Sequence, residues 1–205
     1  MKKKLEIIGY SGHSYVCIEV AMLSGYEIIG YYDIENKLVN PYNISYLGSE
    51  NEIIKSNNFL FVAIGDNQLR QVIYEKLRSN DNFATLIHPS ALFSSTSIIS
   101  ENVLLSAGAI VNAQANIGFG CIINSSAIVE HECYIDDFVH IAPGAVLAGN
   151  VKVGKRSFIG ANATIKQGLT IGEDVVVGAG AVIINDIPSN STVVGNPGRI
   201  IKTKI

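Results

Sequence analysis

Apolar residues recur at every sixth position over the second half of the chain. From Ile87 to Ile183, 17 consecutive positions of this series are apolar, without one insertion. Four residues after each of them stands Ala, Ser, Val, Cys, Leu or Ile, and three residues after, Gly, Asn or Asp occurs at 10 of the 17 positions. Gly, Asn and Asp tolerate the left-handed backbone conformation that a tight corner requires.

A period of six fits neither an α-helix nor the alternation of a half-buried strand. It is typical of a hexapeptide β-helix, in which three six-residue units form one triangular coil and the coils stack through parallel ladders. The repeat therefore predicts between five and six coils with aliphatic side chains inside. Cys121 and Cys133 fall on the small interior position, and we interpret both as core residues.

The first 86 residues follow a different pattern, in which apolar runs alternate with amphipathic segments. Strands are expected at 4–9, 26–33 and 58–65, helices at 13–25, 49–56 and 67–80, and residues 83–87 lead into the first coil. Alternating strands and helices predict a small parallel, Rossmann-like α/β sheet. Because Pro89 marks the change of period, we expect two domains, 1–86 and 87–205.

Charge and hydropathy narrow the class of protein. The net charge is −3 at pH 7, so no broad basic face is expected for nucleic acid or an anionic membrane. The longest apolar stretch, 175–184, is shorter than the roughly 20 residues that span a bilayer, and Glu6 and Gly9 interrupt any secretory signal. We expect a cytoplasmic protein without membrane insertion. Three cysteines indicate neither a disulfide framework nor a metal cluster.

The first predicted turn carries a possible anion site. Gly9, Ser11 and Gly12 lie between a strand and a helix start, where free backbone N–H groups favour phosphate. Asp33 ends the second strand, where dinucleotide-binding sheets place an acid on a ribose hydroxyl, and Gly65 ends the third strand. Since 86 residues are too few for a two-halved dinucleotide fold, a mononucleotide-sized ligand is expected.

Purely structural readings of these residues stay open. The glycine turn can serve only to pack a strand against a helix, and Asp66 or Asn67 can be only the N-cap of the following helix.

One corner of the β-helix carries an imidazole between carboxylates. His131 and Glu132 fall between interior positions, so both side chains should point outward, with Asn124 and Glu130 nearby. A carboxylate that accepts from one imidazole nitrogen fixes the tautomer and raises the basicity of the other nitrogen. Deprotonation of a substrate amine or hydroxyl requires such a base. The alternative is a pair of solvated corner residues.

Three segments of the chain, "IIGYSGHS", "VEHECYIDDFVHIAPGAVLAGNVKVG" and "VVGNPGRIIK", carry a resemblance. With them the whole chain resembles bacterial sugar acetyltransferases that join a small nucleotide-binding α/β domain to a left-handed β-helix. That family includes the nucleotide 4-amino-sugar N-acetyltransferases, among them those of bacillosamine synthesis, and the sialic acid O-acetyltransferases.

The resemblance implies roles for individual residues. His131 would be the general base, and Glu132 would raise its basicity. Acetyl-coenzyme A would contact His140, Gly149, Ala161 and Ala179. The nucleotide sugar would contact Ser11, Gly12, His13, Asp33 and Gly65. Asn124 is expected to contact the substrate because it belongs to the polar patch near His131. Ile34 follows Asp33 where some members carry a second Asp, which leaves the nucleotide preference among UDP, GDP and dTDP open.

The implied reaction is direct acetyl transfer to the 4-amino group of a nucleotide-linked sugar, without a metal. The Gly149 N–H would stabilise the developing oxyanion, and no cysteine is placed to carry an acyl group. The family is trimeric with coenzyme A between adjacent prisms, and His131 and His140, half a coil apart, agree with such sharing. Two alternatives remain: O-acetylation of sialic acid or another sugar, and a β-helix module without catalysis.

Overall fold

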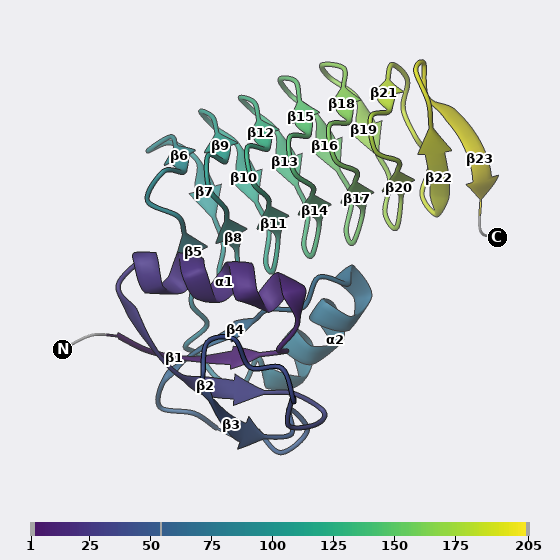
Figure 1. Cartoon of the computed structure of the whole chain (residues 1–205). Helices are drawn as coiled ribbons and strands as arrows, with labels where there is room; N and C mark the ends of the chain where they lie inside the picture. Colours follow the sequence, from purple (N-terminus) through teal and green to yellow (C-terminus); the bar gives the residue numbers. More distant parts are fainter. Residues whose placement is uncertain (1–2, 54, 204–205) are drawn as a thin grey trace.

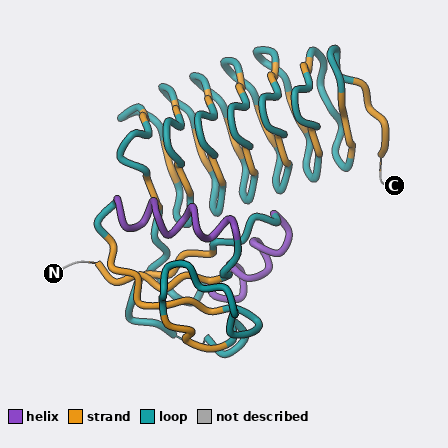
Figure 2. Tube along the Cα trace, viewed as in Figure 1, coloured by secondary structure: helices purple, strands orange, loops and turns teal. Residues whose placement is uncertain are grey.

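The computed structural model describes residues 3–53 and 55–203 and shows two parts joined in sequence. A four-stranded sheet with two helices is followed by a β-helix whose coils succeed one another toward the C-terminus (Figure 1). Helix α1 lies between the sheet and the first coils (Figures 1 and 2).

The sheet is parallel throughout and has the strand order β3-β2-β1-β4. Its elements are β1 (Lys3–Ile8), α1 (Gly12–Leu23), β2 (Tyr26–Tyr32), β3 (Ser45–Gly48), β4 (Phe59–Val62) and α2 (Asn67–Leu77). Leu5 and Ile7 of the central strand are fully buried. The helix expected at 13–25 ends at Leu23 with Ser24 as its C-cap, and Gly25, at φ +84°, turns the chain away from it.

The helix expected at 49–56 is wrong. The described residues of this segment form turns and bends, and the preceding loop contributes β3 instead. Ser49 and Glu52 close a turn here: the Glu52 backbone N–H donates to the Ser49 carbonyl, and the Glu52 side chain accepts from the Ser49 N–H. Local side-chain bonds of this kind compete with helix formation.

The β-helix has three faces, each a stack of two-residue strands. Face 1 contains β5 (Leu86–Ile87), β8 (Leu104–Leu105), β11 (Ile122–Ile123), β14 (His140–Ile141), β17 (Phe158–Ile159), β20 (Val176–Val177) and β22 (Ser191–Val194). Face 2 contains β6 (Leu92–Phe93), β9 (Ile110–Val111), β12 (Ile128–Val129), β15 (Val146–Leu147), β18 (Thr164–Ile165) and β21 (Val182–Ile183). Face 3 contains β7 (Ile98–Ile99), β10 (Asn116–Ile117), β13 (Tyr134–Ile135), β16 (Lys152–Val153) and β19 (Thr170–Ile171). The final strand β23 (Arg199–Thr203) pairs antiparallel with β22.

The six-residue repeat builds this prism as the sequence predicts. Residues 18 apart pair between coils, as Ile117 does with Ile135. Cys121 and Cys133 are 0% and 1% exposed among the aliphatic residues of the interior. Corner residues adopt the left-handed backbone conformation, as Asn102 and Asn150 do with φ angles of 54° and 55°. Asn tolerates this conformation better than most residues.

Polar groups tie the sheet to the prism. Arg70 of α2 is 1% exposed and donates to the carbonyls of Gly120 and Phe138, which lie at the corner between faces 3 and 1 in two successive coils. It also donates to the carbonyls of Ile64 and Gly65 after β4. Apolar contacts add to this link, because Leu86, Leu104 and Ile122 on the first strands of face 1 pack in one cluster with α1 and the sheet. These bonds fix the end of β4 against the β-helix.

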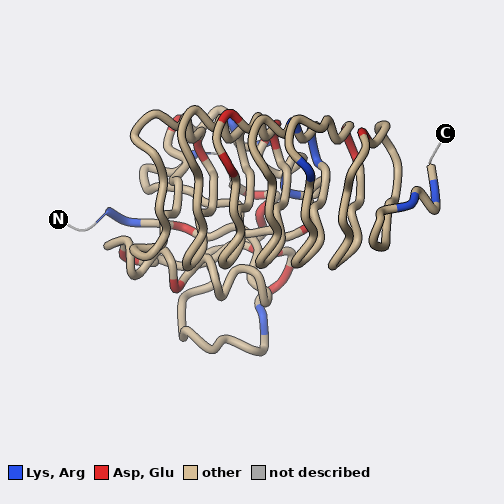
Figure 3. Tube along the Cα trace, turned by 90° about the horizontal axis from the view of Figure 1, so that it is seen from above, with Lys and Arg blue, Asp and Glu red and all other residues tan. Residues whose placement is uncertain are grey.

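Acidic and basic residues are interspersed along the Cα trace, and neither kind is confined to one part of it (Figure 3). No helix within residues 3–53 and 55–203 is long and apolar enough to cross a bilayer. Within the same residues, no three His, Cys, Asp or Glu side chains lie close enough to hold a metal ion.

Candidate active site

The carboxyl edge of the sheet contains a cavity of about 280 Å³. It brings together three residues expected there from the sequence, Gly9, Asp33 and Gly65. The full lining is Gly9, Tyr10, Ser11, Asp33, Ile34, Glu50, Ile64, Gly65, Asp66 and Leu69. Parallel strands place such ligand sites outside their carboxyl ends.

Asp33 organises the loops around this cavity. Its Oδ2 accepts from the Tyr10 backbone N–H at 2.8 Å, and its Oδ1 accepts from the Ile34 N–H at 2.8 Å. Lys37 Nζ lies 3.0 Å from Oδ1. The carboxylate therefore holds the glycine turn and the loop after β2 in one arrangement.

The glycines of the first turn differ in what they need. Gly9 has φ +89°, and a Cβ there would lie 2.8 Å from the Ile64 side chain, so packing alone requires this glycine. A Cβ at Gly12 would meet no described atom within 4 Å. The packing interpretation of the turn thus explains Gly9 but not Gly12, which is exposed at the start of α1.

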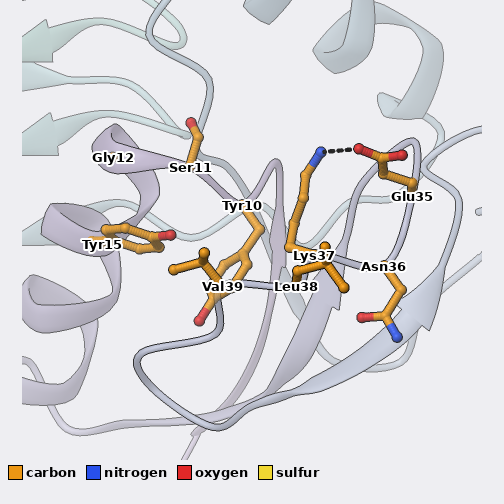
Figure 4. A pocket seen from close by; sticks show the side chains of 9 residues that line it. All are labelled: Tyr10, Ser11, Gly12, Tyr15, Glu35, Asn36, Lys37, Leu38 and Val39. Atoms are coloured by element: carbon orange, nitrogen blue, oxygen red, sulfur yellow. Dashed lines mark hydrogen bonds and ion pairs between the residues drawn. The ribbon is translucent and has the colours of Figure 1, made fainter.

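A second, larger hollow of about 610 Å³ adjoins the first at Tyr10 and Ser11 (Figure 4). Its other side is the loop 35–39, in which Lys37 also pairs with Glu35 at 3.4 Å. Leu38 and Val39 of this loop are exposed.

The helix α2 begins with a cap that the sequence offered as an alternative. The Asp66 side chain accepts from the Leu69 N–H at 2.8 Å, so Asp66 is the N-cap. Asn67 instead donates to the carbonyls of Arg156 and Ser157 of the β-helix.

His140, on face 1, meets the sheet domain. Its ring centroid lies 6.2 Å from that of His13 and 5.0 Å from that of Phe158. Asn124, expected beside His131, lies at the corner between faces 1 and 2, and its Nδ2 is 3.1 Å from His140 Nε2. Because Asn124 Oδ1 accepts from the Ser125 N–H, its Nδ2 is the donor, and His140 Nε2 is the acceptor.

Both imidazoles of this cluster are held neutral. Burial, and then the charge of Arg70, lower the pKa of His140 to about 3 and that of His13 to about 4. His140 Nδ1 is buried without a hydrogen bond of good geometry among the described residues, and the Gly65 backbone beside the ring partly opposes the fall in its pKa. A neutral ring that accepts at Nε2 carries its proton on Nδ1.

His131 lies at the corner between faces 2 and 3, with its side chain 51% exposed. Its Nδ1 is 3.0 Å from Glu132 Oε2, and its backbone N–H donates to the Glu130 carboxylate at 3.3 Å. Glu132 adopts φ 60°, which turns its side chain back beside the imidazole. The outward pair predicted from the repeat is therefore formed.

The imidazole covers Gly149 of the next coil. A Cβ at position 149 would lie 2.5 Å from His131 Cε1, so only glycine leaves room for this ring position. The part of the chain that the structure describes provides no acceptor for the Gly149 N–H. A base and a free backbone donor thus lie side by side, as acyl transfer requires.

The residues expected around acetyl-coenzyme A are divided within one chain. Gly149 shares the His131 corner, whereas Ala161 and Ala179 lie at the corner between faces 1 and 2, and His140 lies on face 1. One prism does not bring these positions together.

Sequence reasoning missed Arg70 and Lys37. Arg70 was one polar residue of an amphipathic helix, and Lys37 one charge of a loop. A basic residue four positions after the acid that ends a strand was the available signal for Lys37. For Arg70 the sequence offered none, because two of its four carbonyl acceptors come from segments 50 and 68 residues away.

Comparison with known proteins agrees with this architecture. Residues 4–77 match the family model of the PglD N-terminal domain, and residues 150–184 match that of the hexapeptide repeat of succinyl-transferase. The acetyltransferase domain of PglB from Neisseria gonorrhoeae is 37% identical, with a TM-score of 0.91 over 97% of this chain and 100% of that chain.

A second similar structure is PerB from Caulobacter crescentus in complex with coenzyme A and GDP-perosamine. It is 35% identical, with a TM-score of 0.89 over 97% of each chain. WeeI from Acinetobacter baumannii, at 24% identity and a TM-score of 0.87, shares the fold.

The predicted fold class is confirmed: a small parallel α/β part followed by a left-handed β-helix of hexapeptide repeats. The chain is an acetyltransferase, and it belongs to the bacterial nucleotide amino-sugar N-acetyltransferase and sialic acid O-acetyltransferase family.

Proposed function

We propose that this enzyme transfers the acetyl group of acetyl-coenzyme A to the 4-amino group of a nucleotide-linked amino-deoxy sugar. The PerB structure contains coenzyme A and GDP-perosamine, and the PglB domain has been solved with acetyl-coenzyme A. Residues 1–86 form the domain for the nucleotide sugar, and residues 87–205 form the acetyl-transfer domain.

The single observation that carries this proposal is the His131–Glu132 pair over Gly149. His131 accepts a proton from the sugar amine at Nε2 while the amine nitrogen attacks the thioester carbonyl carbon. Glu132, 3.0 Å from Nδ1, stabilises the imidazolium that forms. The Gly149 N–H donates to the oxyanion, and collapse breaks the C–S bond as the imidazolium protonates the coenzyme A thiolate.

Direct transfer suits the state of the cysteines. Cys121 and Cys17 are both 0% exposed, and burial raises the pKa of Cys121 to about 12. A buried thiol that is protonated at neutral pH is a poor nucleophile. An acetyl-cysteine intermediate is therefore not part of the proposal.

The nucleotide sugar occupies the cavity at the sheet edge. The turn at Ser11, Gly12 and His13 receives the phosphates, Asp33 faces the ribose, and Gly65 lies at the sugar end beside His13. Support comes from the exposed Gly12 and from His13, whose Cβ lies 3.7 Å from a Cβ built at Gly65. Asn124 donates to His140 Nε2, and the His140 ring lies beside that of His13 at this same end of the cavity.

A homotrimer completes the site in this proposal. Acetyl-coenzyme A lies in the groove between two prisms, against His140, Ala161 and Ala179 of one subunit and Gly149 of the next. Within one prism, Gly149 lies at a different corner from Ala161 and Ala179, which supports such sharing. Cyclic symmetry makes the grooves between the three prisms identical.

Thiol release from acetyl-coenzyme A tests the proposal with a panel of nucleotide 4-amino sugars, the matching 4-hydroxy sugars and free sialic acid. We expect release with an amino acceptor and an amide product by mass spectrometry. Release only with hydroxyl acceptors would replace the proposal by O-acetylation. No release with any acceptor, from protein that binds acetyl-coenzyme A, would indicate a binding module.

A further inference from the structure

Glu50 is a carboxylate in the sheet-edge cavity to which no role has yet been assigned. It lines the cavity together with Asp33 and Ile34. Its Oε2 is buried and, within the described residues, has no hydrogen-bond partner. A buried carboxylate oxygen without a donor is costly, and a ligand that brings a donor relieves that cost.

The strand order fixes where Glu50 lies along a bound nucleotide. Gly65 follows β4, Gly9 follows β1, Asp33 follows β2 and Glu50 follows β3, and the sheet order is β3-β2-β1-β4. Neighbouring strands are about 4.8 Å apart, so Glu50 lies on the order of 10 Å from the glycine turn. With the reacting sugar at Gly65, the ribose reaches Asp33 and the base reaches Glu50.

An apolar side chain at this end suits the face of a flat ring. Ile34, which follows Asp33 after β2, lines the cavity here and is exposed, whereas Ile64 and Leu69 line the opposite end near Gly65. An apolar side chain beside one polar group is typical of sites that orient a ring by its edge.

The hydrogen-bonding edge of the nucleobase decides which nucleotide Glu50 can bind, because a carboxylate only accepts hydrogen bonds. Guanine presents two adjacent donors, N1–H and the 2-amino group, which match the two oxygens of a carboxylate. Uracil and thymine present one N–H between two carbonyl oxygens, which the carboxylate repels. We propose that Glu50 binds the guanine edge and that the acceptor is a GDP-linked amino sugar, an inference that rests on the proposed function.

Nucleoside diphosphates test this specificity apart from catalysis. Titration calorimetry of the full-length protein would compare GDP, inosine diphosphate, UDP and dTDP, with wild type, Glu50→Gln and Glu52→Gln. Inosine diphosphate keeps N1–H but lacks the 2-amino group. Glu52 is the matched control, because it carries the same charge two residues later and bonds the Ser49 N–H outside the cavity.

We expect wild type and Glu52→Gln to bind GDP at least about tenfold more tightly than inosine diphosphate, UDP or dTDP, as a charge-assisted pair of bonds predicts. Glu50→Gln should lose most of this preference while keeping its thermal midpoint and its affinity for UDP. Equal or tighter binding of UDP or dTDP by wild type would overturn the inference, and so would an unchanged preference in Glu50→Gln.

Acetyl transfer separates this inference from the proposed function. Thiol release with UDP- or dTDP-linked 4-amino sugars but not with GDP-linked ones would reject the guanine assignment and leave the proposed function standing. Guanine-selective binding without amide formation from any acceptor would do the reverse.

Discussion

The imidazole of His131 packs against the α-carbon of Gly149 one coil later, so closely that a Cβ there would lie 2.5 Å from Cε1. Gly149→Ala should therefore displace the ring and lower kcat at least about tenfold, since small misplacements of catalytic groups are costly. Steady-state kinetics would measure it. In a double-mutant cycle, Gly149→Ala should add little to His131→Ala; full additivity would show that the two residues act separately.

Replacing the general base His131 should lower activity more than replacing Gly149. His131→Ala is expected to lower kcat by roughly 10²–10⁴-fold, the range for a lost general base. The thermal midpoint should hardly change, because the side chain is half exposed. His88→Ala removes an imidazole near the start of the β-helix and serves as control. Activity within about threefold of wild type in His131→Ala would remove His131 from the mechanism.

The carboxylate of Glu132 should determine the pH below which activity is lost. Glu132→Gln keeps a hydrogen-bond acceptor beside His131 Nδ1 but removes the charge that stabilises the imidazolium. The acidic limb of the kcat/KM–pH profile should then move to lower pH, with a smaller loss of activity than in His131→Ala. Glu130→Gln is the neighbouring control. An unmoved limb would reduce Glu132 to a corner residue.

The half-buried imidazoles of His13 and His140 make stability depend on pH. Their pKa values are lowered to about 4 and about 3, against about 6.5 in the unfolded chain. Between pH 6.5 and about 4 the unfolded state therefore binds more protons, and the free energy of unfolding falls as the pH is lowered. Urea unfolding at pH 7.5 and 5 should show this loss, reduced in His13→Gln/His140→Gln. An equal loss in wild type and the double variant would contradict it.

Arg70 should matter for stability more than any surface cation. Arg70→Met leaves four carbonyl oxygens without their donor, of which those of Gly120 and Phe138 belong to the β-helix. Each buried unpaired group costs about 1–3 kcal/mol, so we expect a loss of at least about 3 kcal/mol by urea unfolding. Arg78→Met, at the exposed end of α2, should stay within about 0.5 kcal/mol. Similar values for both would show that other groups bond these carbonyls.

Most of the fold could be predicted from the sequence because the six-residue repeat determines the structure of its second half. Any residue from Ile87 to Ile183 has an assigned face or corner once the repeat is counted, and the outward position of His131 follows from that count alone. The loops of the α/β part lack such a rule. Residues 49–56 resemble a helix in composition, yet Ser49 and Glu52 bond each other in a turn, and β3 forms just before them.

The candidate site was predicted only where the order of the strands or the six-residue repeat determines which residues meet. Gly9, Asp33 and Gly65 meet because parallel strands end at one edge. The pairing of Asn124 with His140 and the neutral state of His13 depend on how the sheet docks onto face 1. No pattern along the chain encodes that docking, since Arg70 joins segments that are distant in sequence.

The unbroken stacking of the coils restricts how a protein of this kind can change its length. His131 meets Gly149 because they are one coil apart, the same 18-residue step that pairs Ile117 with Ile135. A one-residue deletion between them would turn inward side chains outward along the remaining faces and part the base from its neighbour. Loss or duplication of a whole coil beyond Gly149 would keep every face in phase. Natural variants of this β-helix should therefore differ by multiples of one coil, and shorter indels should collect at its two ends.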